Sequence, residues 1–133
     1  VDVVTMDRLR DGIAEGTAGQ ILDARAAARF AGEAPEPRKG LRAGHIPGSR
    51  NLPFSELFDD DGQYRDEEAI RSLFDAAGID TGAPVTTTCG SGVTACALAV
   101  GLALIGNERT IVYDGSWTEW GGSDAPIKTG GAD

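Results

Sequence analysis

PVTTTCGSGVTACALAVGLALI, residues 84–105, is the stretch that decides the fold of this chain. Its first part, residues 84–88, is rich in β-branched side chains and predicts a strand. Residues 94–105 are apolar on every side, which predicts a helix that is buried all round and ends at Gly106-Asn107. Glycines lie between the two elements. A strand that passes through a glycine-rich turn into a buried helix is typical of a parallel α/β sheet.

The same alternation continues on both sides of this stretch. Apolar spacing and turn residues predict helices over residues 5–14, 24–30 and 66–77 and strands over residues 20–23, 51–54 and 110–113. Thr5 is a predicted helix N-cap, and residues 31–48, with their prolines and glycines, predict a long surface loop. We therefore expect one α/β domain over residues 1–133, with a central, mostly parallel sheet and helices on both faces.

The position of a functional site follows from this architecture. Parallel sheets bind ligands at the carboxyl ends of their strands. The loops that follow Leu22, Thr88 and Tyr113 should therefore lie together along one edge of the sheet. We expect the site at that edge, close to the glycine-rich turn.

Length and charge narrow the classes of protein that the chain can represent. Its 133 residues have room for one domain. It carries 12 Lys and Arg against 21 Asp and Glu, a net charge of −9, which argues against nucleic acid and anionic membrane as partners. The sequence contains no run of about 20 apolar residues, the length that a helix needs to span a bilayer. Two cysteines are too few for a disulfide scaffold, so we expect a reducing compartment, the cytoplasm by default.

The net charge hides a local reversal of sign. Residues 23–50 contain six basic and three acidic side chains, which gives this segment a charge of +3. Residues 56–68, by contrast, hold seven acids and one base and predict a solvated surface. A cationic segment next to the predicted site suits one small anion better than a polyanion.

The turn after the strand places a cysteine where an anion would be stabilised. Successive backbone N–H groups around Cys89 could turn inward, and the N-terminus of the following helix adds its positive end. Cys89 should then be a thiolate nucleophile at neutral pH. The alternative is a buried, inert cysteine. A tyrosine-phosphatase loop is rejected because Ala95 stands where that loop needs arginine, and a Walker loop is rejected because no Gly-Lys-Ser/Thr follows.

The second cysteine, Cys96, lies seven residues after Cys89 within the apolar helix. We interpret it as a core-packing residue. A redox role as a resolving cysteine is the alternative, but strand-to-helix geometry should hold the two sulfur atoms too far apart for a disulfide.

Four stretches together resemble the rhodanese family of sulfurtransferases. They are Asp23-Ala24-Arg25, Gly44-His45-Ile46-Pro47-Gly48-Ser49, the Cys89 loop, and Tyr113-Asp114-Gly115-Ser116-Trp117. The segment Cys89–Ala95 is most similar to the loop in the second, catalytic module of 3-mercaptopyruvate sulfurtransferases. The branch that uses thiosulfate has Arg-Lys in place of Gly90-Ser91.

This resemblance implies a mechanism without metal or organic cofactor. Cys89 would take sulfur from 3-mercaptopyruvate, release pyruvate and pass the sulfur from a persulfide to a small thiol, thioredoxin or cyanide. Ser91 would contact the substrate. Backbone N–H groups would hold the persulfide, those of Gly90, Gly92, Val93 and Thr94 among them.

The resemblance also assigns roles to basic and aromatic residues. Arg29 and Arg38 match the two arginines that grip the substrate carboxylate, a task for which the guanidinium fork is suited. Arg25 is expected to be a structural partner of Asp23. We expect a structural role for His45, the sole histidine of the sequence, and core positions for two tryptophans, Trp117 and Trp120.

The resemblance covers one module, whereas enzymes of this branch contain two. It implies that this domain follows a non-catalytic rhodanese module in a longer protein. Two other functions stay open: a thiosulfate sulfurtransferase, and a non-catalytic rhodanese-like module that carries sulfur or binds a partner.

Overall fold

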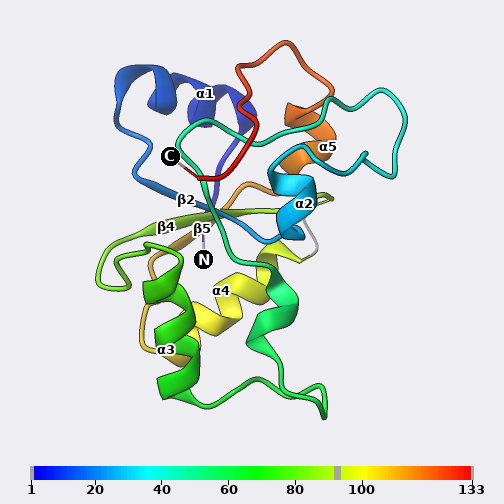
Figure 1. Ribbon diagram of the computed structural model, residues 1–133. Coiled ribbons are helices and arrows are strands. Elements are labelled where there is room, and N and C mark those ends of the chain that lie inside the picture. The colour runs from blue at the N-terminus through cyan, green and yellow to red at the C-terminus, as the bar shows by residue number, and fades with distance from the viewer. Residues whose placement is uncertain (1, 92–93, 133) are drawn as a thin grey trace.

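The computed structural model describes residues 2–91 and 94–132, which fold around one five-stranded sheet (Figure 1). The strands lie in the order β1-β5-β4-β2-β3, and every neighbouring pair is parallel. They are β1 (Asp2–Val3), β2 (Gln20–Asp23), β3 (Arg50–Asn51), β4 (Val85–Thr88) and β5 (Thr110–Val112). The predicted α/β fold with a parallel sheet is confirmed. The strand that the sequence analysis missed is β1.

Helices cover both faces of this sheet, as predicted (Figure 1). They are α1 (Met6–Glu15), α2 (Ala27–Phe30), the 3-10 helix η1 (Phe54–Leu57), α3 (Glu67–Ala76), α4 (Ala95–Leu104) and α5 (Ser116–Trp120). In Figure 1, α3 and α4 lie on one face, and α1 and α5 lie on the other. The sheet is therefore the middle of three layers.

Each face of the sheet has its own apolar core. On the side of α3 and α4, Phe74 and Leu98 are completely buried. On the side of α1 and α5, the cluster contains both tryptophans, which are 1% and 0% exposed. The expected core positions of Trp117 and Trp120 are confirmed.

Capping residues explain where two helices begin. The Thr5 side chain accepts a hydrogen bond from the Arg8 backbone N–H (3.3 Å) at the start of α1. The Asp66 carboxylate does the same for Ala69 (2.9 Å) at the start of α3. Because each side chain satisfies an N–H group that the helix leaves unpaired, both helices start one residue after the cap. The N-cap predicted at Thr5 is confirmed, whereas the cap at Asp66 was not predicted.

The strand expected over residues 51–54 is shorter than predicted. β3 ends at Asn51, and Pro53 leads directly into η1. Proline has no N–H group to donate to a neighbouring strand, so pairing stops before it. The Asn51 side-chain amide instead donates to the carbonyls of Asp23 (3.0 Å) and Arg25 (2.8 Å), which ties the end of β3 to the loop after β2.

The expectation that the helix after Cys89 is buried all round is wrong. Val100 and Leu104 on α4 are 46% and 50% exposed, although Leu98 and Leu102 are fully buried. A helix that lies on one face of a sheet contacts the protein with one side, whatever its composition. Cys96 points to the uncovered side and is exposed, so its interpretation as a core residue is wrong as well.

Within residues 2–91 and 94–132, no helix is long and apolar enough to cross a lipid bilayer.

Candidate active site

The site lies where the loops after β2, β4 and β5 meet, at the carboxyl edge of the sheet. Asp23 is the last residue of β2, Cys89 follows β4, and Ser116 begins α5 after β5. The Cys89 N–H donates to Ser116 Oγ (3.0 Å), which joins two of these loops directly. The three loops therefore lie together at one edge of the sheet, as the rule for parallel sheets predicts.

The backbone on either side of Cys89 is anchored by α5. The Cys89 carbonyl accepts a hydrogen bond from the Trp117 N–H (2.8 Å). The Gly90 carbonyl accepts two, from the Thr118 N–H (2.9 Å) and from Thr118 Oγ1 (2.7 Å). These bonds hold the first residues of the cysteine loop in one conformation, while Cys89 itself is 1% exposed.

Ser116 is a residue that the sequence analysis missed. It is fully buried and, in the described part of the chain, it is the one residue other than glycine with a positive φ (53°). Its hydroxyl accepts the Cys89 N–H, donates to the Tyr113 carbonyl (2.8 Å) and lies 3.8 Å from Cys89 Sγ. A strained backbone held in place by surrounding contacts is common at functional sites. Its position in the Gly-Ser-Trp segment was the available signal.

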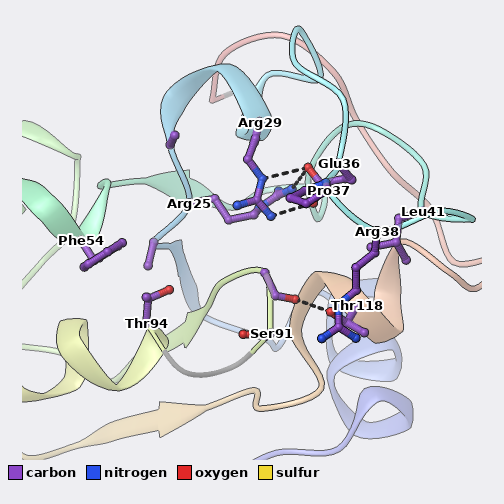
Figure 2. Close-up of a pocket in the computed structure, with 13 residues that line it drawn as sticks. Arg25, Arg29, Glu36, Pro37, Arg38, Leu41, Phe54, Ser91, Thr94 and Thr118 are labelled. Atoms are coloured by element: carbon purple, nitrogen blue, oxygen red, sulfur yellow. Dashed lines mark hydrogen bonds and ion pairs between the residues drawn. The ribbon is translucent and has the colours of Figure 1, made fainter.

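A cavity of about 390 Å³ opens over the cysteine loop (Figure 2). All the predicted site residues that the structure describes, apart from Cys89, line it: Gly90, Ser91, Thr94, Arg29 and Arg38. Cys89 does not line the cavity; three residues that follow it do. Gly92 and Val93, two of the expected persulfide-holding residues, lie outside the described residues.

Arg29 and Arg38 reach this cavity from different segments. Arg29 projects from α2, whereas Arg38 is an exposed residue of the long loop before β3 (Figure 2). Arg29 Nη2 donates to Glu36 Oε1 (2.9 Å). This hydrogen bond raises the pKa of Arg29; burial opposes the rise, and the negative charges of Glu36, Asp23 and Cys89 reinforce it. The guanidinium is thus a cation that Glu36 holds in the wall of the cavity.

Arg25 has the structural role that was expected. Its guanidinium forms an ion pair with Asp23 (2.7 Å), and both side chains are 1% exposed. It also donates to the Gly44 carbonyl (2.7 Å) and lies over the Trp117 ring, 4.6 Å from the ring centre. With these contacts, Arg25 connects β2, the long loop and α5 beneath the cavity.

His45 is also placed in a structural setting. It is completely buried, stacks on Phe30 with 3.9 Å between ring centres, and shares a 2.8 Å hydrogen bond between Nδ1 and the Phe30 carbonyl. Its main chain pairs with Lys128. It does not line the cavity among the described residues, which agrees with the expected structural role.

The comparisons with known proteins agree with this architecture. A protein-family model described as a rhodanese-like domain matches residues 5–123. The chain is 45% identical over 128 residues to thiosulfate/3-mercaptopyruvate sulfurtransferase 1, mitochondrial, of Arabidopsis thaliana, a match that covers 96% of the chain and 34% of the relative. It is 50% identical over 101 residues to 3-mercaptopyruvate sulfurtransferase of Mus musculus, covering 76% and 34% respectively.

A solved structure is similar over most of the chain. The crystal structure of SseA from Escherichia coli, described as a 3-mercaptopyruvate sulfotransferase with the rhodanese fold, superposes with a TM-score of 0.72 at 37% sequence identity. The match covers 87% of this chain and 42% of that one. The chain spans about a third of the length of the curated relatives above.

Proposed function

The chain belongs to the family of rhodanese-like domains, and from this membership we propose that it is a sulfurtransferase domain specific for 3-mercaptopyruvate. Cys89 takes the sulfur of the donor, pyruvate is released, and the sulfur then passes to a thiol or to cyanide. The proposed donor is a small anion that carries a carboxylate. The cavity over the cysteine loop provides two cations, Arg29 and Arg38, for such a group.

The observation that best supports this proposal is the position of Arg29 over the cysteine loop. Arg29 Nη2 lies 2.8 Å from the point at which a Cβ on Gly90 would stand. The cation is therefore packed against the residue next to the nucleophile. A donor whose carboxylate contacts Arg29 would have its sulfur within the neighbourhood of Cys89, as proximity catalysis requires.

The proposed reaction has two transfers. The Cys89 thiolate attacks the sulfur of 3-mercaptopyruvate; the S–S bond forms, the C–S bond breaks, and its electron pair leaves on the enolate of pyruvate. The enolate takes up the proton of the donor thiol and becomes pyruvate, which leaves a Cys89 persulfide. An acceptor thiolate then attacks the outer sulfur, and the pair of electrons of the S–S bond returns to Cys89.

We assign the cavity residues to these steps as follows. Arg29 and Arg38 bind the carboxylate, because a guanidinium matches it with two parallel hydrogen bonds. The Ser91 hydroxyl contacts the substrate. The backbone N–H groups of Gly90, Gly92, Val93 and Thr94 hold the persulfide anion.

Intact-mass measurement tests the proposal directly. After treatment with 3-mercaptopyruvate, the chain should gain about 32 Da, the mass of one sulfur atom, at Cys89. Cys89→Ser should gain nothing, whereas Cys96→Ser, which removes the exposed second thiol, should behave as the natural chain does. A mass gain that persists in Cys89→Ser contradicts the proposed mechanism.

A second candidate donor is thiosulfate. The name of the Arabidopsis relative includes both donors. The side-by-side ratio of kcat/KM for 3-mercaptopyruvate and thiosulfate, with cyanide as acceptor, decides between them. A non-catalytic module that carries sulfur is the third possibility, and it predicts a persulfide without multiple turnovers.

We further propose that the domain acts beside a second, non-catalytic rhodanese module, since its relatives are about three times as long as the matched region. Thioredoxin or a small thiol is the proposed acceptor. The compartment is one that keeps Cys89 reduced, with the cytoplasm as the proposed site. Comparable turnover by this chain alone and by a chain that includes the second module would contradict a contribution from that module.

A further inference from the structure

The Glu36 side chain is a buried anion in the wall of the cavity. It is 1% exposed and accepts hydrogen bonds from Arg29 Nε (3.2 Å) and Arg29 Nη2 (2.9 Å). Arg25 Nη1 is a more distant partner, at 3.4 Å, and Arg25 is already paired with Asp23. Burying a carboxylate is unfavourable unless it is paired and hydrogen-bonded. The principal partner of Glu36 is therefore Arg29.

The two hydrogen bonds from Arg29 determine how its guanidinium is oriented. A guanidinium has five N–H donors in a rigid plane. Glu36 occupies the Nε and Nη2 edge, and Nη1 has no hydrogen-bond partner among residues 2–91 and 94–132. Figure 2 shows Glu36 beside the guanidinium, with Arg29 projecting from α2 into the cavity. The donors that remain are the ones available to a ligand.

Gly90 lies next to the same guanidinium. A Cβ at this position would stand 2.8 Å from Arg29 Nη2, closer than any real Cβ contact. Gly90 does not have a positive φ, so its backbone conformation does not call for glycine. What it provides is space, because any side chain there would displace Arg29. Glu36 thus holds Arg29 in place, and Gly90 leaves free the space that the guanidinium occupies.

We propose that Glu36 is a positioning residue that, together with Gly90, orients Arg29 and thereby makes the site selective for sulfur donors that carry a carboxylate. This inference rests on the proposed function. A carboxylate is planar, and its bidentate pairing with Arg29 works in one relative orientation. The oxygen atoms of thiosulfate are spread evenly around the S–S axis, so thiosulfate accepts many orientations of the cation. Loss of orientation should therefore penalise 3-mercaptopyruvate more than thiosulfate.

The first test compares Glu36→Asp with Glu36→Gln. Aspartate keeps the charge but is one methylene too short to form the same pair, whereas glutamine keeps the length and loses the charge. Both variants should raise KM for 3-mercaptopyruvate roughly tenfold, the size of one weakened charge-assisted hydrogen bond, and lower kcat less. For thiosulfate, kcat/KM should stay within about twofold. Glu33→Gln, an exposed charge change in the same loop, is the matched control and should alter neither donor.

The alternative explanation is a change in the overall field of the site. A field effect predicts that Glu36→Asp is silent and that Glu36→Gln, which removes a negative charge, improves the binding of both anions. Either result overturns the proposal. A double-mutant cycle gives a second criterion: in an Arg29→Ala background, Glu36→Asp should have no further effect on 3-mercaptopyruvate. A full effect in that background means that Glu36 acts through the fold and not through Arg29.

A chemical probe tests the inference without turnover. Iodoacetate and iodoacetamide alkylate the same thiolate and differ in the carboxylate. In a Cys96→Ser background, the alkylation rates at Cys89 are measured by peptide mass. The ratio of the iodoacetate rate to the iodoacetamide rate shows how strongly Arg29 binds a carboxylate. This ratio should fall several-fold in Glu36→Asp and in Gly90→Ala, with unfolding temperatures recorded for both variants.

The two proposals can fail separately. If the natural chain gains no sulfur from either donor, the proposed function fails, and the alkylation ratio still tests the role of Glu36. If the natural chain uses 3-mercaptopyruvate and the ratio is unchanged in folded Glu36→Asp and Gly90→Ala, the orientation of Arg29 is set by something else, and the inference is wrong.

Discussion

Ser116 affects stability in two ways, through the hydrogen bonds of its hydroxyl and through its positive φ. Two substitutions can separate these effects. Its hydroxyl accepts hydrogen bonds from the Cys89 N–H and from Thr88 Oγ1 (3.2 Å), both buried. Ser116→Ala leaves these donors without that acceptor and should cost about 1–3 kcal/mol of unfolding free energy. Ser116→Gly loses the same hydroxyl but relieves the positive φ, so it should be about 1 kcal/mol more stable than Ser116→Ala. Urea unfolding of the two variants measures both differences.

The relative stability of the two variants shows whether the backbone at Ser116 is strained. If Ser116→Gly is less stable than Ser116→Ala, the backbone at this position stores no strain that glycine could relieve. If both match the natural chain in stability, the hydroxyl makes no net contribution to the cysteine loop.

Tyr113 gives the fold a sensitivity to alkaline pH. Burial raises its pKa, and the hydrogen bond that it donates to Glu119 (2.7 Å) and the charge of that carboxylate raise it further. The folded state thus favours the protonated phenol. The resulting stability is fully present below the pKa of a tyrosine in the unfolded chain, about 10, and is lost as the pH rises above it.

We therefore expect the natural chain to lose more stability than Tyr113→Phe between about pH 9 and pH 11. Urea unfolding of both proteins at the two pH values gives the difference. The comparison removes the contributions to pH dependence that the two proteins share. Equal losses would mean that Tyr113 ionises in the folded state as readily as in the unfolded chain.

Sequence reasoning at this scale depended on motifs. Cys89 and the two arginines were predicted as site residues because a spacing or a resemblance points to them. Glu36 and Ser116 were missed because their roles come from tertiary contacts: Glu36 pairs with an arginine on another element, and Ser116 reaches a cysteine 27 positions earlier. A local motif can mark such a residue, but it does not show which distant residue the side chain contacts.

At the scale of elements, α4 shows the limit of hydrophobic periodicity. All ten of its residues are apolar or small, so the sequence contains no signal for which side faces the core. Packing makes the choice. Leu102→Ala, at a fully buried position, should cost about 2–5 kcal/mol because it leaves a cavity. Leu104→Ala, at a side chain that is half exposed, should stay within about 1 kcal/mol of the natural chain.

Chemical denaturation of these two variants checks the assignment, since each removes the same atoms from the same helix. Equal costs would indicate that the outer side of α4 is covered in solution. The C-terminal end of α4 was easier to predict than its buried side, because Gly106 is a local signal for the end of a helix. β1 was missed for a related reason: two residues are too few to form a pattern.

At the scale of the whole molecule, the C-terminal tail braces the loop that carries Glu36 and Arg38. His45 exchanges two main-chain hydrogen bonds with Lys128 (2.8 and 2.9 Å), and the Gly130 N–H donates to the Ala31 carbonyl (2.8 Å). Arg42 adds side-chain bonds to the carbonyls that end α5. The long loop was predicted from its prolines and glycines. Its order comes from these distant segments, which the sequence analysis did not connect to it.

Gly44 is the point at which this bracing can be disturbed. Its φ is 137°, and a Cβ there would collide with the carbonyl oxygen of Lys128. Gly44→Ala combines an unfavourable backbone conformation with a clash against the main chain of the tail. It should cost about 2–4 kcal/mol and should increase hydrogen exchange in both the tail and the loop.

Gly40→Ala is the matched control in the same loop. Gly40 also has a positive φ (84°), but nothing lies within 4 Å of its missing Cβ, so it should show the backbone cost alone, about 1–2 kcal/mol. The excess cost of Gly44→Ala measures the contact with the tail. Because Glu36 and Arg38 sit on the braced loop while Cys89 is anchored separately by α5, Gly44→Ala should also weaken the preference of Cys89 for iodoacetate over iodoacetamide and leave its reaction with iodoacetamide unchanged. If the two glycine variants have equal stability and equal preference, the tail does not hold the loop over the cysteine.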